Sequence, residues 1–123
     1  MVVATIPRGA SSASRAPGFV YLEPFIRAAK ALFSERDLQH IEQTLIADPE
    51  TGQVIAGTGG LRKMRVALAG AGKRGGARLI YYYRGPIGRI YLVTTYPKRE
   101  KDNLTNAERN AFKRMTARLD LET

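Results

Sequence analysis

Lysine and arginine, the side chains that bind phosphate groups, are concentrated in one central stretch of the chain. Residues 51–99 contain ten Lys or Arg and no acid, residues 1–50 carry five basic and six acidic residues, and residues 100–123 carry five of each. The net charge of +9 therefore lies within one segment, and not in a coat of mixed sign that would only aid solubility. A block of one sign predicts a polyanionic ligand, most commonly nucleic acid. A basic surface without a ligand and an acidic protein partner are the alternatives.

Residues 70–76, GAGKRGG, contain the spacing G-x-G-x-x-G of a nucleotide-binding loop. Such a loop joins a strand to a helix, and an acid about 20 residues further on holds the ribose. Here strand-like segments flank the loop on both sides, and no acid occurs between Glu50 and Glu100. The P-loop pattern also fails, because Arg74 stands where Ser or Thr is required. We expect a connection between two strands, either a plain solvated turn or one whose Lys73 and Arg74 reach the phosphates of a long polymer.

Further cations lie on or beside three predicted strands. In LRKMRVALA (61–69), Lys63 and Arg65 alternate with apolar residues and so share a face, roughly 7 Å apart. Antiparallel neighbours could bring these two onto one concave surface with Arg78, Lys98 and Arg99. The alternative is the ordinary solvent face of a half-buried sheet. The tyrosines of the predicted strands are expected mainly to pack, with one or two able to stack on a base: Tyr81, Tyr82, Tyr83, Tyr91 and Tyr96.

The elements that must position these residues follow from hydrophobic periodicity. Residues 1–18 have no helical or strand period and predict a flexible tail ahead of one domain, residues 19–123. In that domain we predict a short strand, a hairpin of two helices, a meander of three or four strands and a last helix at 105–121. Capping boxes are predicted at Ser34 with Asp37 and at Thr105 with Glu108. Apolar spacing predicts the buried faces of the three helices: Ile26, Ala29 and Phe33; Leu38, Ile41 and Leu45; and Phe112, Met115 and Leu119. The predicted class is α+β, with helices packed on a small antiparallel sheet.

Composition excludes several kinds of site. The chain has no cysteine, so disulfides, thiol nucleophiles and cysteine-based zinc sites are absent. Its one histidine, His40, is expected on the outer face of a helix and cannot form a pair that shares acid–base work. The longest apolar runs are too short to span a bilayer, so we expect no membrane partner.

Three segments in order, GTGGLRKMR, GKRGGARLIYYY and GRIYLVTTYPKREKDNLTNAE, resemble the RelE/HigB family of toxin–antitoxin ribonucleases, particularly its HigB-type branch. The similarity covers about Phe19 to Leu119. It implies a RelE-like fold and a cytoplasmic endoribonuclease that needs no cofactor or metal and cuts mRNA, usually in the ribosomal A site. It also implies an antitoxin, often with a helix-turn-helix domain, through which the complex binds operator DNA.

The resemblance also implies which cations work on the sheet. We expect Lys63 to act as general base or acid within a catalytic cluster with Arg65, Arg78 and Arg99, because neighbouring cations disfavour the charged form of a lysine. The expected RNA contacts are Lys73, Arg74, Lys98, Lys101 and Tyr96. Leu104 stands near the place where some relatives carry a tyrosine, and Tyr96 is a candidate substitute. A non-catalytic RNA- or ribosome-binding module, or an inhibitor of an acidic protein, would also need a basic sheet.

Overall fold

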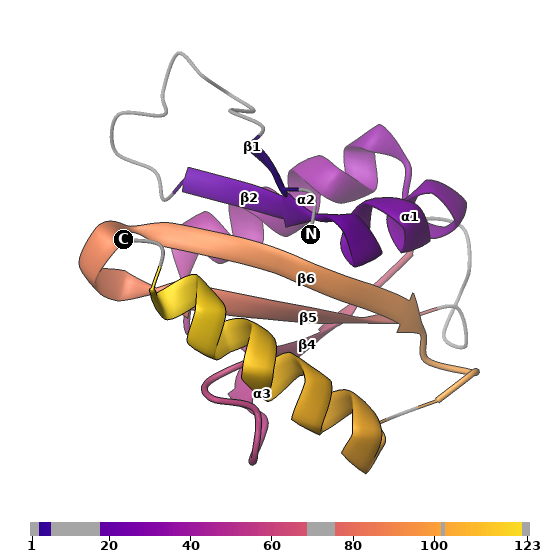
Figure 1. The fold of residues 1–123 in the computed structure, drawn as a ribbon. Helices are drawn as coiled ribbons and strands as arrows, with labels where there is room; N and C mark the ends of the chain where they lie inside the picture. Colours follow the sequence, from indigo (N-terminus) through magenta and orange to yellow (C-terminus); the bar gives the residue numbers. More distant parts are fainter. Residues whose placement is uncertain (1–2, 6–17, 69–75, 102, 122–123) are drawn as a thin grey trace.

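The computed structural model describes residues 3–5, 18–68, 76–101 and 103–121. Its strands are β1 (Val3–Thr5), β2 (Gly18–Leu22), β3 (Gln53–Val54), β4 (Arg62–Val66), β5 (Ala77–Arg84) and β6 (Arg89–Pro97). They form a single sheet in the order β1-β2-β6-β5-β4-β3. The helices are α1 (Glu23–Leu32), α2 (Glu35–Ala47) and α3 (Asn106–Asp120), and a short 3-10 turn, Gly85–Ile87, joins β5 to β6. Figure 1 shows α3 crossing one side of the sheet, with α1 and α2 on the other.

The α+β class is confirmed, but the sheet is mixed. All neighbouring strands run antiparallel except β2 and β6, which are parallel. Parallel neighbours need a long connection, and the whole segment from α1 to the β5–β6 turn supplies it here. The strand β1 was not predicted either: Val3–Thr5, within the expected tail, pair with β2. The other residues expected in the tail lie outside the described ones, apart from Gly18, which begins β2.

The α1–α2 layer follows the predicted helical hairpin closely. Ser34 caps α2, its hydroxyl accepting from the Asp37 N–H at 3.1 Å. Ile41 and Leu45 are buried as the periodicity predicts. In α1 the deepest side chain is Phe25 and not Ile26, which packs only partly against the core. Ala29 and Phe33 are buried as predicted, with Phe25 in the place expected for Ile26.

The last helix, α3, packs on the other side of the sheet. Its predicted cap is present, with the Thr105 hydroxyl accepting from the Glu108 N–H at 3.1 Å. Met115 and Leu119 are buried against the sheet, and Phe112 packs partly against the same cluster. Among the described residues, no helix has the length and apolar character needed to cross a bilayer.

Candidate functional site

The pleat of the sheet directs three of the predicted cations to the side that carries α3. Met64 and Val66 pack with the α1–α2 core, so Lys63 and Arg65, at alternate positions of β4, face the opposite side. Arg78 shares the face of Ile80, which is buried in the cluster under α3. The predicted alternation on β4 is therefore confirmed, and it is matched on β5.

The strand register sets these side chains in a row. Arg65 lies directly opposite Arg78, and Arg78 lies directly opposite Tyr96 on β6. Cβ atoms of residues directly opposite on antiparallel strands are about 4.5–5.5 Å apart. Arg65 and Arg78 can thus reach one phosphate group, and Lys63, one alternation further along β4, borders the same place.

Lys63, Arg65 and Arg78 line one hollow of about 550 Å³ at the edge of the sheet, together with polar residues including Thr51 and Gln53. Beside it, β3 pairs with only two residues of β4, Arg62 and Lys63, and does not reach Arg65. Thr44 of α2 and Met64 complete the lining, so the hollow extends around the edge of the sheet. Arg65 is exposed, whereas Lys63 and Arg78 are half-buried. Since no acid occurs on β3–β6, the strands add no negative charge to this hollow.

The segment leading into α3 contacts the site from a second direction. The Lys63 ammonium donates to Asn103 Oδ1 at 2.6 Å. Lys101 binds the Glu108 carboxylate, and its ammonium lies 4.8 Å from the centroid of the Tyr96 ring. The hydrogen bond from Lys101 lowers the pKa of the Glu108 carboxyl, a stronger effect than the opposing effect of burial.

Tyr96 is only 6% exposed, and Lys101 lies over its ring. A base could stack on this ring only if Lys101 moved. The structure thus places Tyr96 beside Arg78 but under other side chains. Its role in binding RNA stays a prediction.

The remaining predicted cations that the structure describes do not line the hollow. The backbone N–H of Lys98 donates to the Gly76 carbonyl at 2.9 Å, and Arg99 is exposed in the turn after β6. Because Pro97 pairs with Ala77, this turn lies at the end of the sheet where β5 begins, one residue before Arg78. Neither Lys98 nor Arg99 lines the hollow. Lys73 and Arg74 lie outside the described residues.

Two arginines of residues 51–99 bind other parts of the fold. Composition alone did not separate them from the cations of the hollow. Arg62 donates to the Gly52 carbonyl at 2.7 Å and lies 3.3 Å from the Glu50 carboxylate. Arg84 donates to the Leu119 carbonyl at 3.1 Å, at the last turn of α3. His40 is exposed on α2, as expected.

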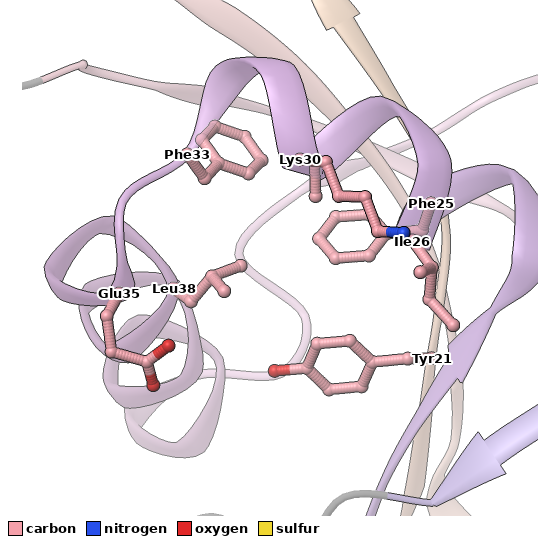
Figure 2. A pocket seen from close by; sticks show the side chains of 8 residues that line it. Tyr21, Phe25, Ile26, Lys30, Phe33, Glu35 and Leu38 are labelled. Atoms are coloured by element: carbon pink, nitrogen blue, oxygen red, sulfur yellow. The ribbon is translucent and has the colours of Figure 1, made fainter.

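A second hollow, of about 290 Å³, opens between α1 and α2. Figure 2 shows Phe25, Phe33 and Leu38 around this space, with the ring of Tyr21 beside them. Apart from Lys30 and Glu35, its lining is apolar or aromatic, and it belongs to the core on the side of the sheet away from Arg78. This hollow therefore lacks the cluster of cations that a phosphate site requires.

The fold and the row of cations agree with what the sequence matches among known families. Residues 20–122 match the family described as "RelE toxin of RelE / RelB toxin-antitoxin system". The match runs from β2 beyond the end of α3 and so includes the whole candidate site. Toxins of this family are generally ribonucleases, and the family implies an antitoxin as partner. The chain thus belongs to the RelE toxin family of toxin–antitoxin systems.

Proposed function

We propose that this toxin is an endoribonuclease that cuts mRNA on the ribosome by attack of a ribose 2′-OH on the adjacent phosphorus. The observation that carries the proposal is the meeting of Lys63, Arg65 and Arg78 at one hollow. Several cations around one hollow suit a reaction in which a phosphate gains charge in the transition state. The family supports ribonuclease activity in general, and the ribosome and the mechanism are our additions.

RNA supplies its own nucleophile, so the protein has four tasks. It must take the 2′-OH proton, hold the oxygen in line with phosphorus, stabilise the pentacoordinate phosphorane and protonate the leaving oxygen. The O2′–P bond forms and the P–O5′ bond breaks, leaving a 2′,3′-cyclic phosphate and a 5′-OH. We assign Arg65 and Arg78, which pair across the two strands, to hold the phosphate oxygens in a bidentate manner, which suits the planar guanidinium.

Lys63 is the side chain that we assign to proton transfer. It borders the arginine row, and as an unprotonated amine it would accept the 2′-OH proton. We assign Arg99, in the turn beside the row, to the phosphate as well, and the proton for the leaving oxygen to Lys98 or to water. The other cations of residues 51–99 would bind ribosomal RNA, and that binding should weaken steeply with salt. The antitoxin, which we propose carries a helix-turn-helix domain, would neutralise the toxin and recruit it to operator DNA.

Arg78→Ala tests the proposal, with Arg118→Ala as matched control, because Arg118 is an exposed arginine on α3. Removing a donor to the transition state should slow cleavage of mRNA on programmed ribosomes by about a hundredfold. The Arg118 variant should cut like the wild type. Cleavage by Arg78→Ala at the wild-type rate would refute the site. Salt-sensitive ribosome binding without any cleavage by the wild type would instead support a non-catalytic binding module.

A further inference from the structure

We propose that Gln53 is a specificity-determining residue, which binds the base of the nucleotide whose phosphate is held by Arg65 and Arg78. The inference rests on the proposed function and deepens it, because it gives the base a place beside the one that the cations give the phosphate. Gln53 lies on β3, the edge strand of the sheet, and lines the same hollow as the two arginines. It is exposed, so its side-chain amide is open to a base that enters the hollow.

The strand register turns Gln53 toward the phosphate site. Gln53 lies directly opposite Lys63, and residues directly opposite on paired strands share a face of the sheet. Arg65 shares this face because it alternates with Lys63 on β4. Gln53 and Arg65 are therefore diagonal neighbours, whose Cα atoms are about 7–8 Å apart. Since the ribose separates a base from its phosphate, a phosphate held at Arg65 leaves the base to a neighbouring side chain such as that of Gln53.

The backbone that carries Gln53 is held by the sheet. The Gly52 N–H donates to the hydroxyl of the fully buried Tyr81 at 2.8 Å, and the Gly52 carbonyl accepts from Arg62 at 2.7 Å. A Cβ on Gly52 would lie 2.9 Å from the Lys63 carbonyl oxygen and from Tyr81, so only glycine permits this close packing. Gln53 therefore presents its amide from a fixed point, as selection between similar bases requires.

The hollow offers more than a phosphate alone requires. Its volume of about 550 Å³ lies within the range of pockets that hold small organic ligands. Besides the cations it contains the amide of Gln53 and the hydroxyls of Thr44 and Thr51. The Thr44 hydroxyl donates its proton to the His40 carbonyl of its own helix at 2.8 Å. The Gln53 amide offers one acceptor and two donors, which match the edge of an unstacked RNA base.

The base preference at the cleaved linkage tests this inference. Ribosomes are programmed with mRNAs that differ only at one of the two nucleotides flanking that linkage, and kcat/KM is compared for each base. Gln53→Ala should lower the ratio between the best and the worst base by about tenfold at one of the two positions. Gln39→Ala changes an exposed glutamine on α2 and should keep the wild-type ratios. Because ratios are compared, a smaller fraction of folded variant affects all four bases equally.

Gln53→Glu gives a result that a purely structural role would not produce. A carboxylate only accepts hydrogen bonds, and guanine is the base that offers two donors, N1–H and N2–H, on its Watson–Crick edge. The substitution should therefore shift the preference toward guanine by about tenfold at the position affected by Gln53→Ala. The added negative charge should also slow cleavage, but it does so for all four bases alike.

The outcomes for the inference and for the proposed function are distinguishable. If the wild type cuts mRNA without base preference, or both Gln53 variants keep its ratios, the base-binding role is wrong while the nuclease stands. Ratios that flatten in Gln53→Ala but do not move toward guanine in Gln53→Glu would overturn direct contact with the base. If the wild type cuts nothing, the proposed function fails and the role of Gln53 fails with it.

Discussion

The loop before β4 provides the sharpest test of how α3 is held on the sheet. Gly59 has a φ of +80°, and a Cβ built on it would come closer than 3.0 Å to Thr116 Oγ1, which real Cβ atoms essentially never do. That hydroxyl, on a side chain only 2% exposed, lies 2.9 Å from both the Thr58 carbonyl and the Lys113 carbonyl of its own helix, so the added Cβ would displace it from Thr58. Gly59→Ala should therefore separate the loop from α3.

The expected magnitude has two parts. A side chain in the left-handed region costs about 1–2 kcal/mol. Turning the Thr116 hydroxyl away leaves the buried Thr58 carbonyl without this donor, at a further cost of about 1–3 kcal/mol. Gly59→Ala should thus lower the free energy of unfolding by about 2–5 kcal/mol relative to a glycine with neither constraint.

Gly57→Ala is the matched control, since Gly57 has a φ of +77° and nothing within 4 Å of its ideal Cβ. It shares the backbone strain and the entropy change of the unfolded chain, so both cancel in the comparison. Urea unfolding followed by far-ultraviolet circular dichroism should show Gly59→Ala about 1–3 kcal/mol less stable than Gly57→Ala. Equal stability of the two variants would mean that the Thr116–Thr58 contact does not hold α3 in place.

Two tyrosines give further predictions. Burial and the hydrogen bond to Asp120 raise the pKa of Tyr82 from 10.0 to about 12, so the folded state keeps this proton longer than the unfolded one. That stabilisation is complete below about pH 10 and is lost as pH rises toward 12, and Tyr82→Phe should abolish this part of the alkaline dependence in urea titrations. Tyr81 is fully buried, accepts from the Gly52 N–H at 2.8 Å and donates to the Pro49 carbonyl at 2.9 Å. Tyr81→Phe should cost about 1–3 kcal/mol of unfolding free energy, and an unchanged urea midpoint would contradict that.

Local features of the fold were predictable because they depend on near neighbours in sequence. Both capping boxes, the buried faces of α2 and α3 and the alternation on β4 follow from residues a few positions apart. The parallel pairing of β2 with β6 was not predictable in this way, since the two strands are separated by the helical hairpin and by β3–β5. On α1, Ala29 was predicted correctly, but Phe25 and not Ile26 is buried beside it, because both are apolar and only packing chooses between them.

The candidate site was predictable to the same extent. Strand alternation and the antiparallel pairing of two neighbouring strands are enough to predict that Lys63, Arg65 and Arg78 lie together. The partners of the other cations could not, because they come from distant segments: Arg62 is bound by the loop after α2, and Arg84 by the end of α3. Asn103 carried no sequence signal, since a single amide beside a helix cap is ordinary until the fold brings Lys63 to it.

The position of α3 links stability to the proposed chemistry. The helix is tied to the sheet at three levels: Lys63 binds Asn103 ahead of its first turn, Thr116 binds the Thr58 carbonyl further along, and Arg84 binds the Leu119 carbonyl at its end. Because the last two contacts lie far along the helix from Asn103, they fix its direction and thereby the place of its first residues. A substitution that weakens the contact at Thr116 should therefore also shift the start of α3. That shift would displace Asn103 from Lys63, although no cation of the row is substituted.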